Sequence, residues 1–125
     1  MISLFVALAF SPQAHAAADW GAVKHANSLQ DVKTAVYGFT PNPDEYKIVS
    51  QFQKAADMVL EAIRCEGGND SLHRDSRNTS LMGAQTMLDA IQAFNDDTQV
   101  QQMASTLTNE VKTMSLMNRD DRLCR

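Results

Sequence analysis

The chain has 125 residues, of which 44% are hydrophobic and 21% are charged, and its formal net charge is −4. This length suits one globular core and is too short for two domains. The acidic balance, with no cluster of Lys or Arg, argues against a nucleic-acid partner.

Residues 1–16 have the pattern of a cleavable secretion signal. The apolar run over 2–10 is too short to span a bilayer as a mature helix. Ala14 and Ala16 then place small residues at the two positions that signal peptidase reads. We therefore expect cleavage after Ala16 or after Ala18, and no membrane insertion of the mature protein.

Cys65 and Cys124 are the two cysteines of the chain, and their spacing fits neither a C-x-x-C redox pair nor a metal site. In an exported protein, an even number of cysteines favours a structural disulfide. Such a bond would close a loop of about 60 residues and stabilise the fold by about 4 kcal/mol. The sequence predicts one helical domain over 17–125 that carries this bond, in the periplasm or secreted.

In chain order, residues 19–37 are expected to form one helix kinked near Ser28, or two short helices. Trp20 and Val23 are the apolar anchors of the first part. Ser28 can cap the second part, and Asp31 lies at the capping-box distance from it.

The strongest helix pattern covers Pro43–Glu66. Asn42 can cap its first turn, and proline is well tolerated at the first helical position. Apolar residues recur at steps of three and four and predict one buried stripe: Tyr46, Val49, Phe52, Ala56, Val59 and Ile63. Gly67 and Gly68 are expected to end this helix.

Residues 67–80 form the longest polar stretch, which predicts a surface loop with at most one helical turn. Thr79 or Ser80 should then cap a third helix, in which Gly83 would allow a neighbour to approach closely. The apolar stripe predicted for this helix consists of Leu81, Ala84, Leu88, Ile91 and Phe94.

Asp97 or Thr98 can cap the last helix, and residues 118–125 read as a charged tail. The stripe of the last helix consists of Val100, Met103, Leu107, Val111, Met114 and Met117. No alternating strand pattern competes. The sequence therefore predicts an all-α, small up-down bundle of about four helices. In this order the long helix and the last helix run parallel, so Cys65 and Cys124 meet at one end.

Residue types with catalytic chemistry gather at Asp70, Ser71, His73 and Asp75. Catalytic triads are assembled from residues distant in sequence, however, so we predict neither catalysis nor a metal site in this loop. The methionines are read as core filler rather than copper ligands. In architecture the chain resembles the periplasmic four-helix cytochromes, but residues 98–125 contain no histidine to ligate haem, and no cofactor is predicted.

The last two predicted helices are poor in charge. Five residues between 79 and 118 are charged: Asp89, Asp96, Asp97, Glu110 and Lys112. Charges are depleted at the cores of protein interfaces, so the outer polar positions are the candidate partner-binding residues. These are Gln92, Gln99, Gln102, Thr106 and Asn109. They would contact another protein or a second copy of the chain, unless the face is ordinary solvated surface.

The sequence favours an exported, non-enzymatic protein-binding domain. By analogy with other small exported helical domains, we expect an inhibitor or an immunity protein acting on a toxin or hydrolase. A periplasmic stress chaperone is the first alternative, and a metal or haem carrier is the second.

Overall fold

The computed structural model describes residues 17–39 and 46–124, and within these ranges the chain forms helices and no strand. Two short helices precede three long ones. Their bounds are α3 (Trp20–His25), α4 (Leu29–Val36), α5 (Tyr46–Ile63), α6 (Ser71–Ala93) and α7 (Thr98–Arg119). The predicted all-α up-down bundle is confirmed.

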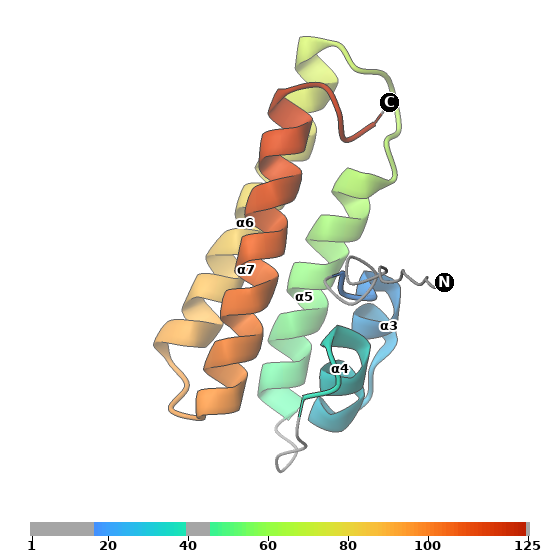
Figure 1. The fold of residues 1–125 in the computed structure, drawn as a ribbon. Helices are drawn as coiled ribbons and strands as arrows, with labels where there is room; N and C mark the ends of the chain where they lie inside the picture. Colours follow the sequence, from blue (N-terminus) through green and yellow to red (C-terminus); the bar gives the residue numbers. More distant parts are fainter. Residues whose placement is uncertain (1–16, 40–45, 125) are drawn as a thin grey trace, which may run out of the picture.

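The three long helices run up, down and up, with α6 packed against both α5 and α7 (Figure 1). The short helices α3 and α4 pack on α5. As predicted, α5 and α7 end at the same end of the bundle, where Cys65 and Cys124 form a disulfide with their Cα atoms 5.4 Å apart.

The core contains most of the predicted stripe residues. Phe52, Leu88 and Leu107, one from each long helix, are fully buried. Gly83 faces Met58 of α5, and a Cβ built on Gly83 would lie 2.9 Å from the methionine sulfur. The close approach predicted at this glycine is therefore confirmed.

Three predicted stripe residues, all at helix ends, are exposed instead, and one of them, Ile63 at the end of α5, is 37% exposed. Tyr46 is 73% exposed and Phe94 is 86% exposed. Tyr46 is the first residue of α5, and Phe94 is the C-cap of α6. A periodic pattern continues to the last turn of a helix, whereas the neighbours that could bury that turn do not always reach it.

The prediction of a surface loop over 67–80 is wrong, because α6 begins at Ser71 and not near Thr79 or Ser80. Asp70 is the N-cap, and its carboxylate accepts a hydrogen bond of 3.0 Å from the backbone N–H of His73. Arg77, in the second turn, is only 5% exposed. The polar composition of these turns therefore reflects a buried polar contact as well as solvent.

The end of the preceding helix also differs from the prediction, since α5 stops at Ile63 and not at Glu66. Cys65 takes a left-handed conformation with φ 56°, and Gly67 follows with φ 86°. The chain therefore leaves the helix at a cysteine, one turn before the predicted glycine stop. The predicted helix start at 42–45 lies outside the described residues.

Residues 19–37 form two short helices, which is one of the two predicted alternatives. At the other end of the chain, α7 extends beyond the predicted stripe. Ser28 caps α4 as predicted, accepting a hydrogen bond of 3.2 Å from the N–H of Asp31. Asn118 and Arg119 belong to α7, so the C-terminal tail begins later than expected. Over the described ranges, no helix combines the length and the apolar content needed to cross a bilayer.

Candidate functional site

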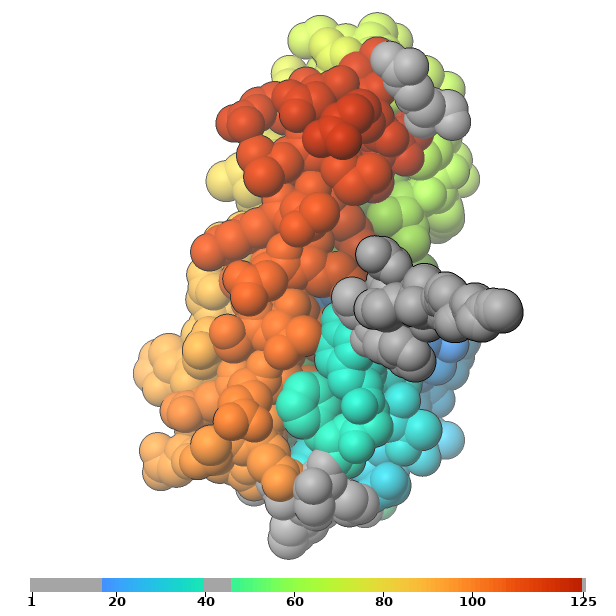
Figure 2. Space-filling view, viewed as in Figure 1, coloured from blue at the N-terminus to red at the C-terminus, as the bar shows by residue number. Residues whose placement is uncertain are grey.

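A shallow hollow without charged side chains lies near the turn between α6 and α7. We call it the neutral hollow, and its volume is about 520 Å³. Its lining residues are Phe39, Gln92, Thr98, Gln101, Gln102, Ser105 and Thr106. Three of the predicted partner-binding residues, Gln92, Gln102 and Thr106, are thus brought together. On the face shown in Figure 2, α7 extends along the molecule with α4 beside its first half.

The other two predicted residues have different positions. Asn109 lines an adjoining depression together with Thr106, Tyr37 and Glu110. Gln99 is instead engaged with α4, because its Oε1 accepts a hydrogen bond of 2.8 Å from Lys33 Nζ. Four of the five predicted residues therefore follow one surface strip, and the fifth joins two helices.

Lys33 is a fully buried cation beside this surface. Burial lowers the pKa of its ammonium, because the charged form loses solvation, and the Asp97 carboxylate acts in the opposite direction. Asp97 is also the predicted cap of α7 and accepts a hydrogen bond of 2.8 Å from the N–H of Gln99. The start of α7 is therefore connected to α4 through polar contacts.

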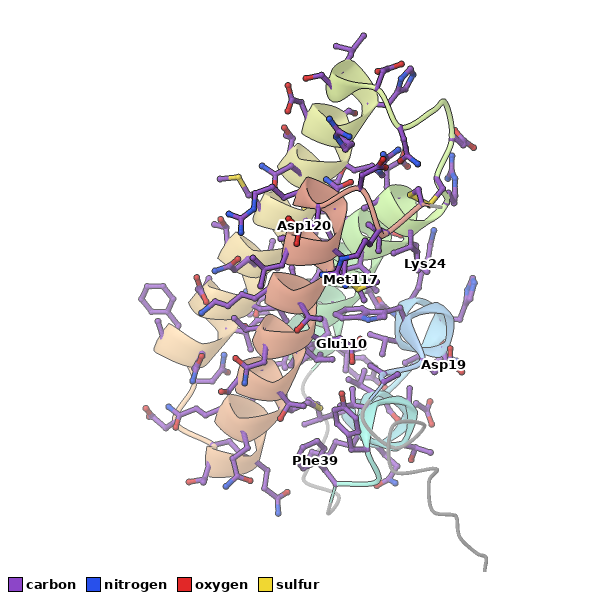
Figure 3. The ribbon with its side chains drawn as sticks, turned by 45° about the horizontal axis from the view of Figure 1, so that its top comes forward. Asp19, Lys24, Phe39, Glu110, Met117 and Asp120 are labelled. Atoms are coloured by element: carbon purple, nitrogen blue, oxygen red, sulfur yellow. A yellow bond between two sulfur atoms is a disulfide. The ribbon has the colours of Figure 1, made fainter. Side chains whose placement is uncertain are left out.

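Glu110 connects the two short helices to the middle of α7, from which it points toward α3 (Figure 3). Its carboxylate accepts hydrogen bonds from the N–H of Ala18 at 2.9 Å, from Tyr37 Oη at 2.9 Å, and from Trp20 Nε1. Burial, the hydrogen bond to Glu110 and the negative charge of that residue all raise the pKa of the Tyr37 phenol above its ordinary range.

Phe39 is positioned at the neutral hollow by this anchoring. Its ring packs edge-on against Tyr37, with 6.1 Å between ring centroids. Gly38, between them, has φ 70°, which a glycine adopts without strain. The contact between Glu110 and Tyr37 therefore also helps to place the aromatic side chain that borders the hollow.

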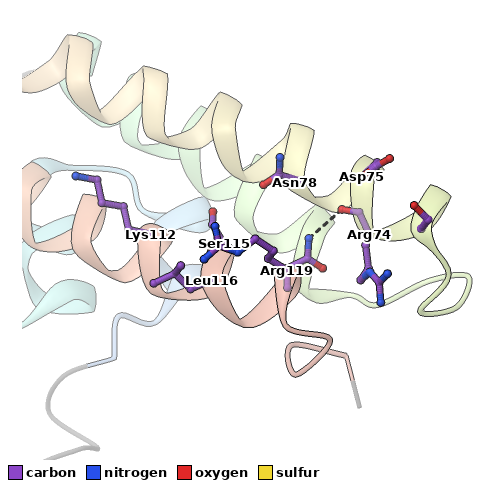
Figure 4. A pocket seen from close by; sticks show the side chains of 9 residues that line it. Arg74, Asp75, Asn78, Lys112, Ser115, Leu116 and Arg119 are labelled. Atoms are coloured by element: carbon purple, nitrogen blue, oxygen red, sulfur yellow. Dashed lines mark hydrogen bonds between the residues drawn. The ribbon is translucent and has the colours of Figure 1, made fainter.

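A second depression, the α6–α7 groove, lies at the opposite end of the helical pair and has a volume of about 670 Å³ (Figure 4). Its lining residues are Ser71, Arg74, Asp75, Asn78, Lys112, Ser115, Leu116, Asn118 and Arg119. In contrast to the neutral hollow, it contains three cationic side chains and one carboxylate.

A buried polar network lies beneath this groove. The Arg77 guanidinium donates to Asn118 Oδ1 at 3.0 Å, to the carbonyl of Gly68 at 3.1 Å and to Asn69 Oδ1 at 2.9 Å. Asn118 Nδ2 donates to the carbonyl of Arg74 at 2.9 Å. Asn69 Nδ2 donates to the carbonyl of Cys124 at 2.7 Å, which connects the network to the disulfide.

The four residues considered for catalysis, Asp70, Ser71, His73 and Asp75, lie at the start of α6, where Asp70 is the N-cap. His73 Nδ1 lies 2.9 Å from the Asp70 carboxylate, and the hydrogen bond from the His73 N–H is the main cause of the lowered pKa of Asp70. Ser71 and Asp75 are exposed on the first turns of the helix. Within the described part of the chain, no group of three or more His, Cys, Asp or Glu residues is placed to hold a metal ion.

The sequence did not lead us to predict these buried polar residues, although their spacing from apolar stripe residues could have indicated them. Lys33 is four residues after Leu29, Arg77 is four residues before Leu81, and Asn118 is four residues after Met114. Each continues an apolar stripe with a polar residue.

The fold defines the class of the protein as an all-α, disulfide-bonded up-down bundle. Comparisons with protein-family models, with curated proteins and with solved structures found no match.

Proposed function

We propose that this chain is an exported, non-enzymatic domain that binds a protein partner through the neutral hollow and the strip of polar residues beside it. We favour an inhibitor or an immunity protein that binds a toxin or a hydrolase. A second copy of the chain is the other partner that the same surface could bind.

The observation that carries this proposal is the composition of the hollow. Its seven lining residues are uncharged, in a chain of which 21% is charged, and they include one aromatic side chain. Interface cores are poor in charge and rich in aromatic residues, because charged groups are costly to desolvate on binding. Hydrogen bonds across the interface would come from the amides of Gln92 and Gln102.

A charge-insertion variant tests this surface. Gln102 is exposed and Thr106 is half-buried, so replacing both with Glu should change the free energy of unfolding by less than about 1 kcal/mol. The same charges would be desolvated in an interface, and binding should weaken by a few kcal/mol. Pull-down from the envelope fraction with both proteins measures partner binding, and sedimentation measures self-association.

The matched control is Ser50→Glu with Lys54→Gln, which changes the net charge by the same amount at two exposed positions of α5. Gln53 on the same helix is unsuitable, since its side chain donates a hydrogen bond to the carbonyl of Ala26. The control should retain both the partner and the sedimentation behaviour. If the Gln102/Thr106 variant behaves like the control, this surface is not the binding site.

A further inference from the structure

Most described Lys and Arg side chains have a partner within the protein, and the exceptions are Lys47 and Lys54 on α5 and two cations of the α6–α7 groove. Lys24 and Arg64 each lie within 3 Å of a carboxylate. Lys33 and Arg77 are buried and donate hydrogen bonds to other side chains. Lys112 and Arg119 are exposed and make no ion pair or hydrogen bond through their side chains within the described ranges. Two cations without internal partners therefore border one depression in a protein of net charge −4.

The groove has an apolar centre between these charges. On α7, Lys112, Leu116 and Arg119 are spaced four and three residues apart, which places them on one face of the helix. Leu116 is 48% exposed. Seven residues separate the two cations, a rise of about 10 Å along the helix. Figure 4 shows these residues on one wall of the groove, with Arg74 and Asn78 of α6 on the other.

We propose that the α6–α7 groove binds an acidic peptide segment in which two carboxylates flank an apolar side chain. Lys112 and Arg119 bind the carboxylates, and Leu116 contacts the apolar group. Because side chains of an extended chain alternate between two faces and each residue advances about 3.3 Å, carboxylates four residues apart share one face with an apolar residue midway between them. Their separation of about 13 Å is within reach of the long Lys112 and Arg119 side chains. Asn78 and Ser115 supply polar groups for the peptide backbone.

The opposite wall contributes a third cation. The Arg74 guanidinium has its nearest carboxylate, Asp121, at 3.9 Å, which is a weak contact in partly exposed surroundings. A bound carboxylate could therefore compete for Arg74 at little cost.

The same geometry disfavours other anions. A single inorganic phosphate has no apolar group for Leu116, and it can contact both Lys112 and Arg119 only if their side chains converge from backbone positions about 10 Å apart along the helix. A long uniform polyanion would meet the Asp75 carboxylate in the groove and the excess of acidic residues over the rest of the surface. This site is distinct from the neutral hollow, so it does not depend on the function proposed above.

Fluorescence anisotropy with a labelled Gly-Glu-Ser-Leu-Ser-Glu-Gly peptide, in which both Glu residues and Leu share one face, tests the proposal on the disulfide-bonded protein. We expect binding at low salt that weakens as salt is added, and no binding of the peptide in which Gln replaces both Glu residues. Lys112→Gln and Arg119→Gln should each weaken binding about two- to fivefold, as is usual for exposed ion pairs. Leu116→Ser should remove the preference for this peptide over its Leu-to-Ser analogue.

Lys47→Gln and Lys54→Gln provide the matched control, since both lysines are exposed on α5 and the change in net charge is the same. The control proteins should bind the peptide as the unmodified protein does, and all variants should keep its thermal transition. Equal weakening by the control substitutions would show general charge attraction and overturn the site. So would absence of binding at low salt, equal binding of the Gln peptide, or inorganic phosphate binding to the groove as tightly as the peptide.

Discussion

At the scale of single residues, Glu110 and Tyr37 form the contact that connects both short helices to α7. One carboxylate accepts hydrogen bonds from residues 73, 90 and 92 positions away in sequence. A carboxylate with three donors in a partly buried position needs those donors to offset its loss of solvation. The orientation of Phe39 at the neutral hollow depends on the same contact.

Replacement of Tyr37 by Phe should change how stability depends on pH. Burial and Glu110 raise the pKa of Tyr37 in the folded protein, whereas the phenol of the unfolded chain titrates near about pH 10. The folded state therefore keeps a proton that the unfolded state loses. The stabilisation is fully present below about pH 10 and declines as the pH rises further.

Urea unfolding at a series of alkaline pH values measures this effect. The difference in free energy of unfolding between the unmodified protein and Tyr37→Phe should be constant below about pH 10 and shrink above it. The lowered pKa of Lys33 acts with the opposite sign, but it is common to both proteins and cancels in the difference. Parallel curves for the two proteins would contradict the raised pKa.

Replacement of Thr108 by Val should stabilise the fold. Thr108 is 7% exposed, and its hydroxyl has no hydrogen-bond partner within the described structure. A buried hydroxyl without a partner carries the cost of its lost hydration, and valine has nearly the same shape without that group. We expect the free energy of unfolding to rise by about 1 kcal/mol, measured by urea unfolding. Thr113→Val at an exposed site of the same helix is the control and should show no comparable gain.

At the scale of helices, the first turns of α6 depend on their contact with the end of α7. The propensity of this polar segment for helix is modest, and the cap at Asp70 satisfies only part of the first turn. The hydrogen bonds of Arg77 to Asn118, and of Asn118 to the Arg74 carbonyl, fasten α6 to α7 at this end. Amide exchange of residues 75–80 should consequently be slow, as for a helix and not for a loop.

A double-mutant cycle measures this contact. Arg77→Met should lower the free energy of unfolding by about 2–4 kcal/mol, because three hydrogen bonds of a buried cation are lost. Asn118→Leu should also destabilise the fold, and the double variant should lose at least about 1 kcal/mol less than the sum. Arg64→Met is the control, since Arg64 is exposed, and it should cost less than about 1 kcal/mol. Strict additivity of the two substitutions would contradict a shared network.

At the scale of the whole molecule, the disulfide joins the ends of the two parallel helices across 59 sequence positions. The carbonyl of Cys124 also accepts a hydrogen bond from Asn69, and Asn69 in turn accepts one from Arg77, so the disulfide is connected to the Arg77 network. The bond therefore closes the end of the bundle on which the α6–α7 groove lies.

Replacement of both Cys65 and Cys124 by Ser should lower the free energy of unfolding by about 4 kcal/mol, because the unfolded chain regains the entropy of an open loop. Urea unfolding followed by circular dichroism measures this loss. The unmodified protein under reducing conditions should coincide with the double variant, and its oxidised form should contain no free thiol after unfolding. A loss below about 1 kcal/mol would show that the end of the bundle is held without the bond.

The sequence by itself determined the features that depend on local backbone geometry. The helical period, the caps at Ser28 and Asp97 and the glycine facing Met58 are all encoded within a few residues, so they could be predicted. The up-down order then followed from the short connections, and it placed Cys65 beside Cys124.

Only the tertiary structure decided which polar residues are buried. Lys33, Arg77 and Asn118 occupy stripe positions, and each has a hydrogen-bond partner 41 or more positions away in sequence. A polar residue at such a position is exposed or buried according to whether a distant partner satisfies its hydrogen bonds, and local periodicity contains no information about that partner. The neutral hollow is a second example. The sequence indicated that this face is poor in charge, but the hollow also needs Phe39 beside α7, and Phe39 is placed there by the distant contact of Tyr37 with Glu110.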